Sequence, residues 1–428
     1  MMRIARAYAV TGCVAAIFCL VYLALDFNRL YALRYGADLG TFVQTLVNVR
    51  HGSSWNGAEW RPHFQVHNSW VLSVLALPIA IAPRTETLLV IQVLTVAFAA
   101  FPLVAFARRV GNTGIGADLL GAAYLIAPAT QGLAYENFTE AVFVPLFAFC
   151  AALAVRARRL LPALIVGQLL LGLKEDQALF VAWFAIACAL WWDRRIGVTL
   201  LVLAMLNGFA FEMVERFHGV HTNQPGYSLA IYDPGAKLGM IALLLLPFAF
   251  TPLAIGRWLL LGVPLLAEIL FAEPWAFEVS RIGSHWVAPL SAGTAVAAAI
   301  GLPRWPAATR ALIPCALIAG IVFSDTVVKV GRWPYIVDWS RYARAAGLRD
   351  GTQGAVIPRE DEGVWAVAAV NPRVRLALPS QGLGVKCPAY NRDATAFFGS
   401  IGVGAPKTVL LCGGVPVPPG TATPKPYP

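Results

Sequence analysis

Long apolar runs, separated by short polar segments, fill the chain up to about residue 324. Such a run crosses the roughly 30 Å hydrocarbon core of a bilayer when about 20 residues fold as a helix. Ten-residue segments of alternating polarity, which a membrane barrel requires, do not recur in the sequence. The pattern therefore predicts an all-α polytopic membrane protein with about eleven transmembrane helices. The expected helices are 8–25, 87–107, 115–129, three that end near Arg156, Lys174 and Asp193, and then 196–211, 238–253, 258–271, 285–300 and 311–323.

Arginines gather at alternate ends of these predicted helices. Arg3 and Arg6 precede the first helix, and Arg108-Arg109 follow the second. We interpret the segment 1–25 as a first transmembrane helix and not as a cleaved signal peptide. Cytoplasmic loops of membrane proteins carry an excess of Lys and Arg. The distribution therefore predicts a cytoplasmic N-terminus, a helix bundle over 86–324, and an extracytoplasmic location for everything after it.

The segment 26–85, between the first two long helices, is the polar part of this apolar region. It holds Asp26, Asp38 and three histidines. Within it, Leu39, Phe42, Val43, Leu46 and Val47 fall on one helical face, which is typical of a short helix lying in the membrane interface. Residues 69–82 are apolar but too few to span a bilayer comfortably, so we expect a re-entrant or interfacial helix that does not cross.

Composition agrees with this class and limits the partners. The chain is 58% hydrophobic and 13% charged, whereas soluble domains average about 25% charged residues. The net charge of +10 would suggest nucleic acid as the partner of a soluble chain. Here the arginines mark helix ends, so membrane topology accounts for the charge and we expect a lipid bilayer, and no nucleic acid, as the partner.

After residue 324 the pattern changes. Charged residues become frequent, and short β-like runs at 354–358, 364–370 and 407–412 are separated by Pro and Gly turns. We predict a small α/β extracytoplasmic domain over 325–414 and a Pro-rich disordered tail over 415–428. Cys387 and Cys412 are the two cysteines of this region, and an oxidising compartment favours a disulfide between them.

Asp38 is the first candidate for chemistry. A carboxylate at the mouth of a membrane cavity can take a proton from an acceptor hydroxyl or hold a metal, but an Asp at this place can also be a plain helix cap. His63 and His67, four residues apart, could share a helical face as metal ligands, although two histidines alone are a weak signal. No metal site is assigned on this basis.

The second group of candidates lies at the ends of later helices. Lys174, Glu175 and Asp176 follow an apolar helix; they are either a solvated helix end or a phosphate contact oriented by two carboxylates. Arg281 and His285 are four residues apart and could bind a lipid phosphate.

Three glutamates complete the candidates. Glu136 and Glu140 begin the fourth helix, where solvent exposure is a sufficient alternative explanation. Glu268, inside the ninth predicted helix, is costly in a membrane unless it is paired, so it is a functional candidate.

Several short runs carry a family resemblance. They are Gly36-Ala-Asp38-Leu-Gly-Thr-Phe-Val-Gln44, Asn48-Val-Arg-His-Gly52, His63-Phe64, Arg108-Arg109, Ala123-Tyr-Leu-Ile-Ala-Pro128-Ala, Lys174-Glu175-Asp176 and Asn371-Pro-Arg. Together they resemble the bacterial membrane protein family numbered 2079 among domains of unknown function. One departure is the run Glu136-Asn-Phe-Thr139-Glu140, where that family usually has an Asp-x-His-Pro-Glu-like run.

That family is similar in layout to the C-type (GT-C) glycosyltransferases, which take sugar from a polyprenyl-phosphate donor. The resemblance implies a bacterial inner (plasma) membrane enzyme whose catalytic acid falls on Asp38. Lys174, with Glu175 and Asp176, or Arg281 with His285, would then hold the donor, while His63 and Glu140 stay open as further substrate contacts. The acceptor would be an extracytoplasmic glycan or protein, and a divalent metal stays open because some C-type enzymes use one. The alternatives are a transporter or flippase of a lipid-linked saccharide and a non-catalytic envelope assembly protein.

Overall fold

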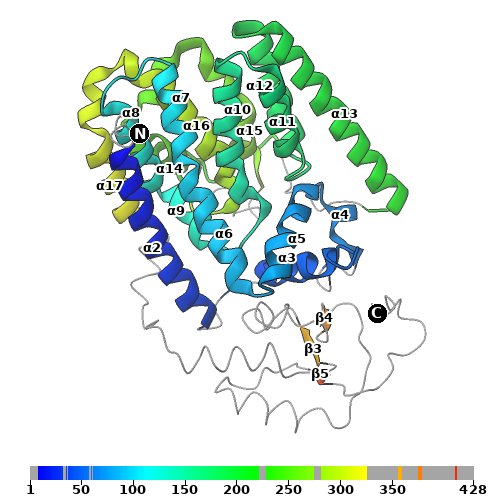
Figure 1. Cartoon of the computed structure of the whole chain (residues 1–428). Helices are drawn as coiled ribbons and strands as arrows, with labels where there is room; N and C mark the ends of the chain where they lie inside the picture. The colour runs from blue at the N-terminus through cyan, green and yellow to red at the C-terminus, as the bar shows by residue number, and fades with distance from the viewer. Residues whose placement is uncertain are drawn as a thin grey trace.

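A computed structural model describes most of the chain up to residue 324 and three short strands beyond it. The described residues are 8–31, 35, 37–56, 59, 61–220, 228–273, 281–324, 355–358, 375–377 and 410–411. Up to residue 324 they form a bundle of helices, with a separate group of short helices at one end of it (Figure 1). The longer helices are α2 (Ala9–Tyr31), α3 (Ala37–Val49), α6 (Thr85–Phe98), α7 (Ala100–Arg109), α8 (Gly116–Ile126), α9 (Pro128–Tyr135), α10 (Val144–Arg156), α11 (Leu160–Leu171), α12 (Gln177–Trp191), α13 (Arg194–His218), α14 (Pro234–Leu245), α15 (Val263–Phe271), α16 (Ala288–Gly301) and α17 (Leu312–Val322).

Shorter elements connect these helices. The short helices are α4 (His63–Val66), α5 (Ala76–Ile81), η1 (Trp70–Leu75), η2 (Glu140–Phe143), η3 (Leu246–Phe248), η4 (Thr251–Gly262), η6 (His285–Val287), η7 (Leu302–Arg304) and η8 (Pro306–Arg310). β1 (Trp55–Asn56) and β2 (Arg61–Pro62) form an antiparallel pair. In a second sheet, β3 (Ala355–Pro358) lies between β4 (Arg375–Ala377), to which it is parallel, and β5 (Leu410–Leu411), to which it is antiparallel.

Four helical segments of the described chain are long and apolar enough to cross a bilayer. They are Ala9–Tyr31, Thr85–Arg109, Arg194–His218 and His285–Arg304. Six shorter apolar helices accompany them: Trp70–Ile81, Gly116–Ile126, Leu160–Leu171, Gln177–Trp191, Pro234–Phe248 and Leu312–Val322. The protein is thus a helical, multi-pass membrane protein, as predicted; the count of eleven spans stays a prediction.

Two of the predicted helices end later than the sequence suggested. The first helix continues to Tyr31 instead of Leu25, so Asp26 lies inside α2, with none of its surface exposed. The seventh continues to His218 instead of 211, so Glu212 and Glu215 lie on α13 and not in a loop. Both predictions were wrong because polar residues were taken to mark the end of a helix. In α13 the real end is set by Gly219, whose φ of 61° is a common helix stop.

Proline and positive-φ residues break other predicted spans into pieces. Ala127 is extended at ψ 136° because Pro128 follows it, and this separates α8 from α9. Helix α9 then continues to Tyr135, beyond the predicted helix end at residue 129. In the predicted eighth span, Ala249 and Phe250 have φ of 50° and 57°, and they end η3 before η4 begins.

Arg108, one of the arginines predicted at helix ends, lies where the end of α7 meets the starts of α2 and α8. The guanidinium of Arg108 lies 4.3 Å from the ring centroid of Tyr8, just before α2, and its Nη2 is 2.8 Å from Oδ2 of Asp118 on α8. The chain after α7 packs on the chain after α16, because a Cβ on Gly111 would lie 3.9 Å from Pro303. We call this the arginine end.

The opposite end of the bundle holds the polar loops, and we call it the charged end. There Arg29, near the end of α2, donates to the carbonyl of Tyr135 at the end of α9. Tyr31 donates to Glu86 at the start of α6 over 3.4 Å. The helices α3, α4 and α5 lie at this end (Figure 1).

The segment Trp70–Ile81 begins and ends at the charged end. At its start the backbone N–H of Val71 donates to the carbonyl of Gly172, 3.1 Å away. After its end, Glu86 meets Tyr31 as described above. Its outward side chains Val74, Leu77 and Ile81 are exposed. The segment is therefore an apolar arm whose two ends both lie at the charged end; that residues 69–82 do not cross the membrane stays a prediction.

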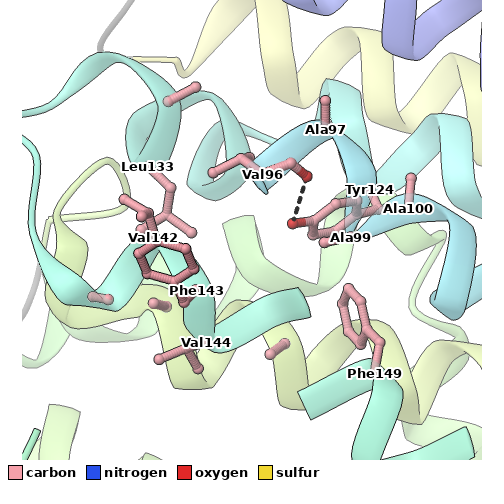
Figure 2. Packing of buried hydrophobic residues seen from close by; sticks show 14 of the residues in the cluster. Val96, Ala97, Ala99, Ala100, Tyr124, Leu133, Val142, Phe143, Val144 and Phe149 are labelled. Atoms are coloured by element: carbon pink, nitrogen blue, oxygen red, sulfur yellow. Dashed lines mark hydrogen bonds between the residues drawn. The ribbon is translucent and has the colours of Figure 1, made fainter. Parts of the chain in front are cut away.

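The core of the bundle lies where α6, α7, α8 and α10 meet (Figure 2). Tyr124 of α8 packs edge-on against Phe149 of α10, with ring centroids 5.3 Å apart. Its hydroxyl donates to the carbonyl of Val96 over 3.4 Å, just before the turn at Ala99 that separates α6 from α7 (Figure 2). An unpaired hydroxyl is costly in an apolar interior, and this contact gives it a partner.

Several predictions about the C-terminal region lie outside the described residues. These are the disulfide between Cys387 and Cys412, the run 364–370 and the tail 415–428. Strands β3 and β5 fall in two of the three runs predicted to be β-like, while β4 was not predicted. The small domain over 325–414 stays a prediction.

We expect Thr113 and His51 to lie on opposite sides of the membrane. Thr113 is exposed in the loop at the arginine end, and His51 is exposed after α3 at the charged end. In a variant without the seven native cysteines, a membrane-impermeant thiol reagent applied to intact cells should label only one of Thr113→Cys and His51→Cys. Permeabilisation should expose the other, and equal labelling of both in intact cells would contradict the two-ended bundle.

Gly132→Ala should destabilise the protein, because α9 packs without a gap against the chain before η6. A Cβ on Gly132 would lie 2.3 Å from the Cα of Gly283, and forced overpacking typically costs about 1–3 kcal/mol. The measurement is the thermal unfolding midpoint in detergent. Gly12→Ala is the control, because nothing lies within 4 Å of that position, and it should leave the midpoint unchanged or raise it.

Candidate functional site

Charged side chains from four separate segments meet at the charged end. The turn between α11 and α12 supplies Lys174, Glu175 and Asp176. The loop before the arm supplies Glu59, His63 and His67, the start of η2 supplies Glu140, and the chain around η6 supplies Arg281 and His285. The structure therefore brings together residues that lie more than 200 positions apart in the sequence.

Lys174 lies at the centre of this group. Its Nζ is 3.6 Å from the ring centroid of Trp286 on η6, which is cation–π contact distance. Burial alone would lower the pKa of the ammonium group, but the charges of Asp176, Glu140 and Glu175 outweigh burial and raise the pKa above its usual value. Lys174 is therefore held in the charged form by the neighbouring carboxylates.

Glu175 is paired with the loop before the arm. Its Oε1 lies 3.2 Å from Nδ1 of His67, and its Oε2 accepts from the backbone N–H of Asn68 over 3.4 Å. Burial would raise the pKa of this carboxyl, but the hydrogen bond and charge of His67, with Lys174, lower it to about 2. The same contact raises the pKa of His67 although burial opposes it. This pair fastens the loop to the turn.

Glu59 joins the two histidines of the loop. Its Oε1 is 2.8 Å from Nδ1 of His63 and 3.8 Å from Nε2 of His67. His63 is buried against Phe42 of α3, with ring centroids 5.3 Å apart, and its Nε2 has no hydrogen-bond partner. The two histidines that were considered as a metal pair thus share one carboxylate, and their ring centroids lie 5.1 Å apart.

Glu136 holds the two cations that were predicted to bind a lipid phosphate. It forms an ion pair with Arg281, and its Oε2 accepts from the backbone N–H of His285 over 2.6 Å. Burial would raise the pKa of Glu136, but His285 and Arg281 lower it. The charge of Arg281 and the ring of His285 are therefore already paired with the Glu136 carboxylate at this site.

Two other carboxyl groups have an oxygen without a partner. Glu140 is 5% exposed, and its Oε2 makes no hydrogen bond. Glu268 of α15 is half-buried, and its Oε2 is also unsatisfied. Its charge acts on Lys174, which places it near the same group. Asp176 also belongs to the charged group around Lys174, and burial raises the pKa of its carboxyl.

A small pocket lies among these side chains, with space for about one water molecule. Glu140, Lys174, Asp176, His285 and Trp286 supply its polar and aromatic lining. A much larger apolar cavity of about 290 Å³ lies between α10, α12, α14 and α16. The two spaces share three lining residues, Val144, Gln177 and Pro289, so the apolar cavity ends at the charged group.

Asp38, the predicted catalytic residue, lies in the first turn of α3 with its side chain half-buried. The expected face of that helix is confirmed, since Leu39, Val43 and Leu46 are fully buried. The contacts that unite the other candidates run through Lys174, Glu175 and Glu136. Whether Asp38 acts in chemistry stays a prediction.

The described residues hold no group of three or more His, Cys, Asp or Glu side chains arranged to bind a metal ion. A site made of protein ligands alone therefore does not fit this part of the chain.

Sequence reasoning missed Glu59 and Trp286. Trp286 was overlooked because no sequence pattern links it to Lys174, although cations commonly lie over the ring of a Trp. Glu59 was overlooked because its four-residue spacing to His63 spans β2 and not one helix.

Glu175→Gln should destabilise the protein most between about pH 4.5 and 6.5. The pKa of Glu175 is lowered from 4.5 to about 2, so its stabilising effect is present above pH 4.5 and lost as the pH falls towards 2. The pKa of His67 is raised from 6.5, so its effect is present below pH 6.5 and lost above it. Within this window we expect a loss of about 1–3 kcal/mol, seen as a lower unfolding midpoint. Glu212→Gln, at an exposed pair with Arg216, should change little at any pH, and a Glu175→Gln effect independent of pH would contradict the pairing.

Comparison with known proteins gives one match. A family model described as a predicted membrane protein, DUF2079, matches residues 29–214. No curated protein and no solved structure matches the chain. The matched segment contains Asp38, His63, Glu140 and the Lys174–Asp176 turn, but not Arg281, His285, Trp286 or Glu268. The resemblance drawn from the sequence is thereby confirmed over residues 29–214, where the chain is similar to the DUF2079 predicted membrane proteins.

Proposed function

We propose that this protein is a membrane glycosyltransferase that moves a sugar from a polyprenyl-phosphate donor to an extracytoplasmic glycan or protein acceptor. One observation carries the proposal. The apolar cavity of about 290 Å³ meets the charged pocket at Val144, Gln177 and Pro289. A space that is apolar over most of its length and charged at one end suits a lipid with a polar head. The apolar cavity would bind part of the polyprenyl chain.

The three shared residues support a phosphate at this junction. Val144 begins α10, Gln177 begins α12, and Pro289 lies in the first turn of α16. Each helix start carries the positive end of a helix dipole. Three such ends around one pocket favour an anionic group, as does the ammonium of Lys174.

Each residue then has a role in the transfer. Lys174 compensates the phosphate charge that grows as the bond between the sugar carbon and the phosphate oxygen breaks. Asp38 takes the proton from the acceptor hydroxyl as that oxygen forms the new bond to the sugar carbon. The polyprenyl phosphate leaves with the electrons of the broken bond. Arg281 and His285, held by Glu136, keep Trp286 and Lys174 in place.

The membrane orientation is part of the proposal. The arginine end would face the cytoplasm of a bacterial inner membrane, because positively charged loops are retained there. The charged end and the region after residue 324 would then be extracytoplasmic, where the acceptor is.

A transporter or flippase of a lipid-linked saccharide is the second candidate. Transporters often use helices that are broken inside the membrane, and this chain has breaks at Ala127–Pro128 and at Ala249–Phe250. A flippase would move the donor intact, whereas a transferase would release polyprenyl phosphate. Purified protein incubated with labelled donor and acceptor separates the two. A non-catalytic envelope assembly protein would do neither.

Asp38→Asn should abolish transfer while the protein stays folded and still binds the donor. Asn keeps the oxygen that can cap α3 but loses the basic oxygen, so we expect a rate loss of about 10²–10⁴-fold. The measurement is single-turnover transfer from a labelled polyprenyl-phosphate sugar. Near-full activity in Asp38→Asn would contradict the assignment and make Asp26 or Glu140 the next base to test.

Lys174→Ala is the matched comparison, because it removes the charge opposite the phosphate and leaves Asp38 intact. We expect weaker donor binding, measured directly by titration with labelled donor. Unchanged affinity in Lys174→Ala would show that the phosphate lies elsewhere.

A further inference from the structure

The charged pocket contains more carboxyl groups than cations. Of its lining residues, Glu140 and Asp176 carry carboxyl groups that act on one ammonium, that of Lys174. The other carboxylates nearby already have partners: Glu175 is bonded to His67, and Glu136 to Arg281 and His285. One positive charge is therefore missing from the pocket itself.

Glu140 shows where that charge is missing. It is 5% exposed and lines the pocket, yet its Oε2 has no hydrogen-bond partner. A buried carboxylate oxygen without a donor is destabilising, and such groups usually have a ligand, ion or water as their partner.

The size and the aromatic wall of the pocket limit what can enter. It has room for a group about as large as a water molecule, which excludes a sugar ring but admits a primary ammonium group. An ammonium has three N–H donors and no acceptor. Trp286 already holds the ammonium of Lys174 over its ring at 3.6 Å, so the wall of this pocket suits cations.

We propose that the pocket binds a primary ammonium group on the sugar of the lipid-linked donor, with Oε2 of Glu140 as its acceptor. This inference rests on the proposed function and names its substrate class: an amino sugar whose nitrogen is not acylated. The head of such a donor carries both charges. Its phosphate would lie at the junction with the apolar cavity, beside Val144, Gln177 and Pro289, and its ammonium alone would enter the pocket and meet Glu140.

The same arrangement disfavours other donors. An N-acetylated sugar has no positive charge and needs room for the acetyl group. A uronic acid would add another carboxylate to a pocket that already has too many, and unpaired like charges in a buried site are strongly unfavourable.

The experiment compares two donors on the full-length protein in lipid nanodiscs. The probes are polyprenyl-phosphate glucosamine and the same lipid with N-acetylglucosamine, each radiolabelled. We expect the wild type to bind the amine-bearing donor about tenfold more tightly or better. In Glu140→Gln this preference should fall to within about twofold. Glu212→Gln, an exposed residue of α13 paired with Arg216, is the control and should keep the full preference.

The outcomes separate the inference from the proposed function. Equal binding of the two donors by the wild type overturns the inference, and this comparison needs no variant to fold. A preference that survives in a folded Glu140→Gln overturns it too, because another group then holds the amine. Preference for the amine without any release of polyprenyl phosphate supports the inference and contradicts the transferase. Transfer from both donors at equal rates and affinities contradicts the inference and supports the transferase. If the protein binds neither donor, the inference and the proposed function are both contradicted.

Discussion

The charged end of this protein is organised by the need to neutralise one ammonium group away from bulk water. Lys174 is half-buried, and its charge is kept by carboxylates that come from η2, from its own turn and from α15. A charge in such a place is costly unless groups of opposite sign are fixed around it. The need to neutralise this charge brings together segments that are far apart in the sequence. It also keeps the turn between α11 and α12 next to the starts of α10 and α16.

Pairing also explains why the loop before the arm is ordered. Its polar side chains reach the bundle through specific partners: His67 through Glu175, and Asn68 through the carbonyl of Leu171 at 2.9 Å and Oδ1 of Asn207 at 2.7 Å. Asn207 belongs to α13, so the loop is joined to two different helices. In the absence of a large apolar core of its own, a loop of this kind is held by hydrogen bonds whose partners lie in the bundle.

The sequence predicted the kind of fold well and the ends of its elements less well. Apolar runs and arginine positions were enough to foresee a multi-pass bundle with one polar segment, because lipid allows few alternatives. The ends of α2 and α13 were misplaced because Asp26 and Glu212 were assumed to lie in loops, whereas burial and helix length are decided by tertiary contacts. The candidate site was predicted as residues but not as an arrangement. Lys174, Glu140 and His285 were singled out one by one, while their proximity depends on packing between helices far apart in the chain.

The contact between Trp70 and Gly172 has a mechanical meaning. A Cβ at position 172 would lie 2.2 Å from the indole of Trp70, so the ring at the start of the apolar arm rests directly on the backbone two residues before Lys174. The remainder of that arm exposes Val74, Leu77 and Ile81, side chains that only lipid solvates favourably. Because the indole contacts this backbone without a gap, a displacement of the arm would also displace the turn that holds Lys174.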